Sequence, residues 1–113
     1  MKIYHNPRCS KSRDSFNLLV EKGIDFETVE YLNEPLNKKE IKALLKKLGI
    51  PAADLIRKAE KDYKENFKGK KLTEAKWIDA MVKYPKLIER PIIVKGNKAV
   101  IGRPIEKVLE LIG

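Results

Sequence analysis

The sequence predicts a single α/β domain over residues 1–113, with a mixed sheet and a helical insertion at about 37–86. Short β-branched or apolar runs stand near both ends of the chain, whereas the middle carries apolar residues at helical spacing. A chain of 113 residues is long enough for one modest hydrophobic core. The two ends should therefore supply the sheet, and the middle should supply helices.

The N-terminal segment reads as a strand, a tight turn, a helix and a second strand. Lys2-Ile3-Tyr4 is a short apolar run, and Asn6-Pro7 after it is a turn dipeptide. Ser10 and Ser12 are good N-cap candidates for the helix that follows, whose apolar residues recur at helical spacing. The second strand is predicted at 25–31, where apolar and polar residues alternate.

The middle of the chain predicts a series of helices. Asn37 can cap a helix with a clean apolar stripe, which Gly49 ends. Thr73 can cap a later helix that stops at Pro85. Between these two helices, residues 52–70 carry a weaker signal that suggests two short helices.

The last third of the chain predicts a β-hairpin followed by a helix. The runs 91–94 and 98–101 are rich in β-branched residues and flank Lys95-Gly96-Asn97. Pro104 suits the first position of the last helix. The complete order, β-α-β, several helices and then β-β-α, is the arrangement of a thioredoxin-like fold.

The chemistry of the chain is concentrated between His5 and Arg13, a segment that holds the only histidine and the only cysteine. Cys9 is expected in or just before the first turn of the first helix. Free N–H groups and the positive end of the helix dipole favour an anion there, and neighbouring cations lower the pKa of a cysteine. Arg8 and Lys11, together with Arg13, supply fixed positive charge. Cys9 is thus predicted to be a reactive thiolate, beside which an oxyanion could also bind.

Composition argues against several other classes of protein. No apolar run approaches the roughly 20 residues of a membrane span, and Met1 leads straight into the motif, so neither a span nor a signal peptide is expected. One cysteine can form neither an internal disulfide nor a zinc site built on cysteines, and a reactive thiol suits the cytoplasm. The net charge of +9 is spread without interleaved aromatic residues, which does not favour nucleic-acid binding.

Four motifs stand along the chain, namely HNPRCSKSR at 5–13, LIRK at 55–58, ERPI at 89–92 and IGRP at 101–104. In this order, and across nearly the whole chain, they resemble the motifs of the glutaredoxin-coupled arsenate reductase (ArsC) family. The resemblance implies the thioredoxin-like fold of ArsC/Spx-like proteins, with a helical insertion. It also implies that the Arg90–Pro91 peptide bond is cis.

The same resemblance assigns roles to individual residues. Cys9 matches the family's catalytic cysteine. The matched oxyanion-binding residues are Arg57, Arg90 and Arg103, and the matched thiolate-supporting residues are His5, Ser12 and Arg13. The implied activity is reduction of arsenate to arsenite, with glutathione as co-substrate and glutaredoxin as the partner that resolves the mixed disulfide. No bound cofactor, no metal and no membrane partner are expected.

Other functions remain open from the sequence. Cys9-Ser10-Lys11-Ser12 is the monothiol version of a C-x-x-C motif, which fits a general glutathione-dependent thiol reductase. An Spx-like regulator that binds RNA polymerase shares the fold, although Ser12 replaces the second cysteine of its redox-switch members. A binding module without turnover is the third alternative to arsenate reduction.

Overall fold

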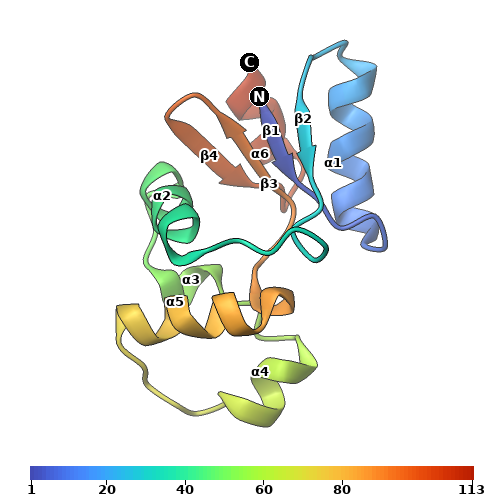
Figure 1. The fold of residues 1–113 in the computed structure, drawn as a ribbon. Helices are drawn as coiled ribbons and strands as arrows, with labels where there is room; N and C mark the ends of the chain where they lie inside the picture. The colour runs from blue at the N-terminus through green and yellow to red at the C-terminus, as the bar shows by residue number, and fades with distance from the viewer. The chain divides into compact units, whose positions relative to one another are not determined.

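The computed structural model describes residues 1–113 as two compact units, Met1–Glu34 with Arg90–Gly113, and Pro35–Glu89. The first unit contains the sheet and two helices (Figure 1). Its elements are β1 (Lys2–Tyr4), α1 (Ser10–Glu21), β2 (Glu27–Val29), β3 (Ile92–Lys95), β4 (Lys98–Ile101) and α6 (Glu106–Ile112).

The sheet of the first unit has the strand order β2-β1-β3-β4. Strands β1 and β2 are parallel, whereas β1 with β3 and β3 with β4 are antiparallel. A β-α-β half and a β-β-α half thus share one mixed sheet. The predicted α/β class and its thioredoxin-like fold are confirmed.

The strand register brings three loops to one end of the sheet. Tyr4, the last residue of β1, is paired with Ile92, the first residue of β3. Ile92 is paired in turn with Ile101, the last residue of β4. Segments 5–9, 90–91 and 102–103 therefore leave the sheet at the same end, although they are up to about a hundred residues apart in sequence.

The core of the first unit lies on one face of the sheet. Ile3 and Ile93 are cross-strand partners, and both are fully buried. Leu19 from α1 and Val108 from α6 pack in the same cluster. Because all four side chains meet, α1 and α6 cover the same face, and burying such side chains stabilises this layer by roughly 1.5–3 kcal/mol each.

The second unit, Pro35–Glu89, is helical. Helix α5 contacts α2, α3 and the 3₁₀ turn η1, and Trp77 of α5 has the rings of Tyr63 and Phe67 as neighbours. Asn37 caps α2, as predicted, and the structure shows that the cap is a reciprocal capping box with Glu40. The elements are α2 (Lys38–Leu48), α3 (Ala52–Leu55), α4 (Lys61–Asn66), α5 (Glu74–Lys83) and η1 (Pro85–Leu87).

Several local predictions need correction or extension. Neither Ser10 nor Ser12 caps α1, because Cys9 itself occupies the N-cap position with extended backbone. The last helix begins at Glu106, so Pro104 lies in a bend before it. The predicted cis Arg90–Pro91 bond is confirmed, and Arg103–Pro104 is cis as well, which was not predicted.

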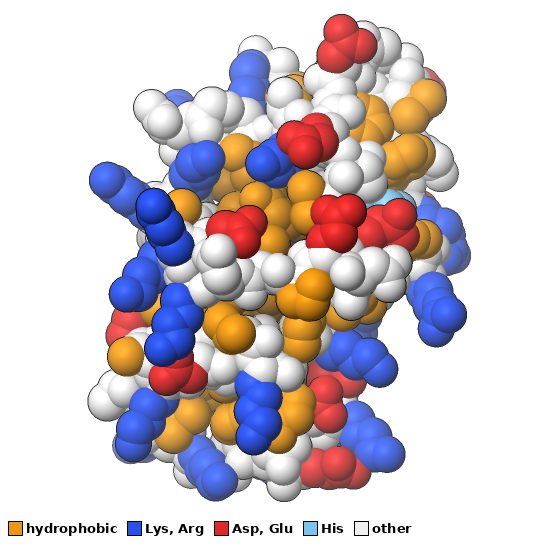
Figure 2. Space-filling view, in the orientation of Figure 1, with side chains coloured by type: hydrophobic (Ala, Val, Ile, Leu, Met, Phe, Trp, Pro, Cys, Tyr) orange, Lys and Arg blue, Asp and Glu red, His pale blue; other side chains and the backbone are white.

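Two expectations from composition concern the spread of positive charge and the membrane-spanning segments. On the face drawn in Figure 2, Lys and Arg side chains are spread out, with Asp and Glu among them, rather than gathered in one patch. No helix combines the length and the hydropathy needed to cross a bilayer.

Candidate active site

A tight turn between β1 and α1 presents Cys9. The Cys9 N–H donates to the Asn6 carbonyl over 3.0 Å, and the Arg8 N–H donates to Asn6 Oδ1 over 3.1 Å. The Cys9 carbonyl in turn accepts from the Arg13 N–H, which starts the helical hydrogen bonding of α1. With Cys9 at the N-cap, its partly exposed sulfur lies at the end of the helix where N–H groups are free.

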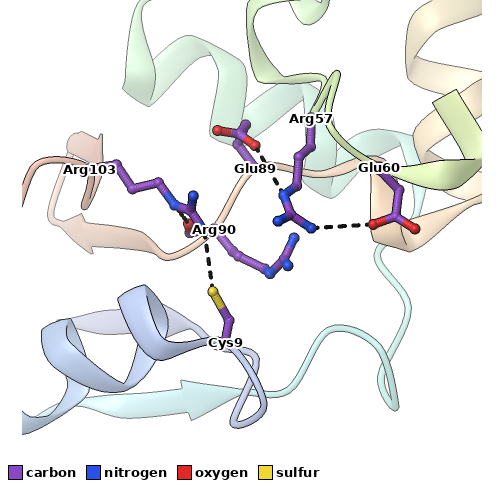
Figure 3. Close-up of polar contacts among 6 residues, drawn as sticks. All are labelled: Cys9, Arg57, Glu60, Glu89, Arg90 and Arg103. Atoms are coloured by element: carbon purple, nitrogen blue, oxygen red, sulfur yellow. Dashed lines mark hydrogen bonds and ion pairs between the residues drawn. The ribbon is translucent and has the colours of Figure 1, made fainter. Parts of the chain in front are cut away.

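Arg103 reaches Cys9 from the other end of the sequence. Its Nη2 donates to Cys9 Sγ over 3.2 Å, and its Nε donates to the Arg90 carbonyl over 2.7 Å (Figure 3). The carbonyl bond orients the guanidinium without neutralising its charge. Arg103 therefore brings a full positive charge into contact with the sulfur.

Arg90 contributes a second charge to the same place. Its side chain is buried, and its Nε makes no hydrogen bond within the chain. A buried guanidinium N–H without a protein partner is uncommon, and no carboxylate of the chain pairs with this guanidinium. The Arg90 charge also acts on Cys9.

The pKa of the Cys9 thiol is lowered from its ordinary value. Partial burial of the sulfur raises the pKa, but four stabilising interactions with the thiolate outweigh this effect. In decreasing order they are the Ser12 N–H, the Arg90 charge, the Lys11 N–H and the Arg103 charge. The helix N-terminus and two arginines brought in by the fold thus favour the nucleophilic thiolate.

His5 and Ser12 form a buried polar pair beside the turn. His5 Nδ1 lies 2.6 Å from Ser12 Oγ, which also accepts the Asn6 N–H over 3.0 Å. Burial lowers the pKa of His5, a neighbouring Glu30 carboxylate raises it and Arg13 lowers it, so that the net shift is downward. A neutral His5 can accept the Ser12 hydroxyl hydrogen, and the pair fixes the turn to the start of α1.

The cations of the motif itself have a smaller part than the sequence suggests. Arg13 donates to the Pro7 carbonyl over 3.0 Å, so it holds the turn rather than the sulfur. Arg8 and Lys11 are exposed, and Lys11 acts on Cys9 through its backbone N–H. The charges that lower the thiol pKa are those of Arg90 and Arg103.

Arg57 is the one predicted site residue that belongs to the second unit. Its Nη1 lies 3.3 Å from Glu60 Oε2, and its Nε lies 3.9 Å from Glu89 Oε1 (Figure 3). All three side chains are partly buried. Arg57 is therefore already paired with two carboxylates.

A close contact between α1 and the loop after β4 was not predicted. A Cβ on Gly102 would lie 2.6 Å from Ser15 Oγ and 2.9 Å from Pro91 Cγ. Gly102 also donates its N–H to the Pro91 carbonyl over 2.8 Å. Only glycine at position 102 leaves room for this loop and Pro91 to pack so closely against α1, the helix that starts at Cys9.

The chain brings together no group of three or more His, Cys, Asp or Glu side chains that could hold a metal ion. What the first unit does assemble is a thiol of lowered pKa with two guanidinium groups and two helix-terminal N–H groups. Such a set can stabilise a thiolate and can bind an oxyanion at the same sulfur.

Comparisons with known proteins show the family of the chain. The chain is 52% identical over 115 residues to "Uncharacterized protein YfgD" of Escherichia coli (strain K12), covering 100% of this chain and 97% of that protein. It is 42% identical over 112 residues to "Arsenate reductase" of Haemophilus influenzae (strain ATCC 51907 / DSM 11121 / KW20 / Rd), covering 97% of each. The solved structure of "Arsenate reductase from Vibrio cholerae" superposes with a TM-score of 0.91 at 42% identity, covering 97% of each chain. The ArsC family profile matches residues 4–111, and this protein belongs to the ArsC family.

Proposed function

We propose that this protein is an arsenate reductase in which Cys9 is the nucleophile. The observation that carries the proposal is the contact of Arg103 Nη2 with Cys9 Sγ, together with the lowered pKa of that thiol. Relatives named arsenate reductase at 41–42% identity over nearly the whole chain support the same substrate.

In the first step, the Cys9 thiolate attacks the arsenic of an arsenate held by Arg90 and Arg103. A sulfur–arsenic bond forms, and one arsenic-bound oxygen leaves as water after taking up protons. No electron has yet been transferred, so arsenic is still As(V). The two arginines offset the negative charge that otherwise repels the thiolate from the anion. Arg57, which the family resemblance adds as a third oxyanion ligand, stays a prediction.

In the second step, a glutathione thiolate attacks Cys9 Sγ. A sulfur–sulfur bond forms, the sulfur–arsenic bond breaks, and its electron pair goes to arsenic, which leaves as arsenite. Because the chain has one cysteine, the second thiol has to come from outside. Glutaredoxin then reduces the mixed disulfide on Cys9, and this chemistry suits the reducing cytoplasm.

The proposal is tested by NADPH-linked arsenate reduction with glutathione, glutathione reductase and glutaredoxin. Turnover is expected with the complete mixture and is expected to disappear in Cys9→Ser, which removes the thiol and keeps the size of the side chain. Omitting glutaredoxin should slow turnover if the mixed disulfide is its substrate. Normal turnover in Cys9→Ser would contradict the mechanism. Reduction of glutathione mixed disulfides without arsenate turnover would instead indicate the thiol reductase.

A further inference from the structure

A hollow of about 430 Å³ lies beside the Cys9 site in the first unit. This volume falls in the range of about 300–1,000 Å³ that is typical of sites for small ligands. Its lining comes from the first turns of α1 and from the segment that links β4 to α6, namely Lys11, Asp14, Gly102, Arg103, Pro104, Ile105 and Glu106. We refer to it as the Lys11–Glu106 hollow.

The hollow adjoins the reacting sulfur through a shared residue. Arg103 lines it and also donates Nη2 to Cys9 Sγ over 3.2 Å. Arg103 Nε is taken up by the Arg90 carbonyl, whereas no hydrogen bond within the chain engages Nη1. A molecule seated in the hollow is thus one guanidinium group away from the thiol.

Charges of both signs line the hollow without pairing. Lys11 and Asp14 stand one turn apart on α1, and Glu106 lies in the first turn of α6. None of these three side chains, nor Arg103, belongs to an ion pair of the chain. The charges of Lys11, Asp14 and Glu106 therefore stay available. Arg103 shares its charge with Cys9 Sγ through Nη2, and its Nη1 makes no hydrogen bond within the chain. Pro104 and Ile105 add an apolar wall.

We propose that the Lys11–Glu106 hollow binds a small zwitterionic thiol, with its ammonium group on Asp14 and Glu106 and its carboxylate on Lys11 and Arg103. A simple anion would be repelled by the two carboxylates, and a simple cation by Lys11 and Arg103. A molecule that carries both charges satisfies all four side chains, and a peptide thiol such as glutathione belongs to this class.

This inference rests on the proposed function, in which an external thiolate attacks Cys9 Sγ and displaces arsenic. It adds that recognition of the external thiol depends on residues other than Arg90 and Arg103. Holding the charged ends of the peptide in the hollow would raise the local concentration of its thiol at the sulfur, which is a positional effect.

The test uses no arsenate, so that it can fail separately from the proposed function. Cys9, as the only cysteine, is converted to its mixed disulfide with 2-thiopyridine. An added thiolate attacks Cys9 Sγ, forms a new sulfur–sulfur bond and releases pyridine-2-thione, which is followed by absorbance. The quantity measured is the second-order rate constant for glutathione divided by that for neutral 2-mercaptoethanol, because this ratio cancels changes in the reactivity of Cys9.

The ratio is expected to fall about fivefold in Asp14→Asn combined with Glu106→Gln, and less in Lys11→Gln, in line with the modest strength of exposed charge pairs. The carboxylate variant should also lose its preference for glutathione over N-acetylglutathione, which lacks the ammonium group. Glu21→Gln, on α1 but outside the hollow, and Lys107→Gln, beside Glu106 but outside it, should keep the full ratio.

An unchanged ratio in both hollow variants would overturn the inference, whether or not the enzyme reduces arsenate. An equal fall in the control variants would overturn it as well, since the effect would then come from net charge alone. If arsenate turnover is absent but the ratio falls as expected, the hollow is supported as a thiol site and the arsenate substrate is rejected.

Discussion

Arg103 and Arg57 are both held by two partners, but only Arg57 has two carboxylates as its partners. Arg103 donates to the Arg90 carbonyl and to Cys9 Sγ, whereas Arg57 faces the carboxylates of Glu60 and Glu89. A carbonyl orients a guanidinium and leaves its charge in place, while two carboxylates orient it and offset its charge. The comparison teaches that arginines matched by the same family motifs need not be equally available to an anion.

The largest effect should come from Arg103→Leu. Loss of the charge and of the Nη2 contact should raise the pKa of Cys9 toward its value in the unfolded chain. The loss of one oxyanion donor should lower kcat/KM for arsenate on the order of 100-fold. Arg103→Lys keeps the charge but lacks the planar fork of the guanidinium. Its thiol pKa and its kcat/KM should therefore lie between those of the wild type and of Arg103→Leu. If the thiol pKa of Arg103→Leu is as low as that of the wild type, Arg103 does not stabilise the thiolate.

Gly102→Ala should act on the same thiol through packing alone. The new Cβ would meet Ser15 Oγ and Pro91 Cγ, and overpacking of this kind costs about 1–3 kcal/mol of stability. Relief of the contact should displace Arg103, so the thiol pKa should rise as it does in Arg103→Leu, but by less. Adding Ser15→Ala removes the nearest atom and should restore part of both losses. Urea unfolding measures the loss of stability, and thiol titration measures the rise of the pKa. An unaltered stability would show that the loop at Gly102 moves to accommodate the new Cβ without cost.

Replacing both carboxylate partners of Arg57 tests whether its charge is available to an anion. If Arg57 binds the oxyanion, Glu60→Gln with Glu89→Gln frees its charge and should lower the KM for arsenate about two- to fivefold, with kcat unchanged. Arg57→Leu should raise the KM. If neither variant changes the KM, Arg57 is held only for structure, and the family-based prediction for it is wrong. The thiol pKa supplies the control, because its lowering in this structure comes from residues of the first unit.

The smallest effect is expected from Asn37→Ala in the second unit. It removes the capping box of α2 and should lower stability by about 1 kcal/mol, measured by urea unfolding. Lys39→Ala, at an exposed position of the same first turn, is the matched control and should cost less. A change in the thiol pKa of Asn37→Ala would show that the second unit contributes to thiolate activation, against the present account.

Much of the fold could be predicted because local signals agree with one another along the chain. Asn37 and Thr73 each specify a helix start, and the turn at Gly96 specifies a hairpin. The N-cap of α1 was mispredicted because Ser10 and Ser12 are better caps by preference than Cys9. Here the turn at Asn6 fixes where the helix begins.

Residues of the candidate site could be proposed from the sequence, but their contacts could not. Arg103 and Cys9 are 94 residues apart, and only the register of β1, β3 and β4 brings them together. The sequence placed three cations next to Cys9, yet the charges that lower its pKa come from Arg90 and Arg103. The close approach of Gly102 to Ser15 comes from the packing of the folded chain, which no residue pattern encodes.

The most direct test of the account is the pH dependence of Cys9 alkylation by iodoacetamide, in the folded protein and in urea. Because only the thiolate reacts and the chain has one cysteine, the midpoint of the rate profile is the pKa of Cys9. We expect a lower midpoint in the folded protein than in urea, and hence a fold that loses stability as the pH falls through that midpoint. A midpoint equal to or above that in urea would contradict thiolate stabilisation by Arg90, Arg103 and the start of α1.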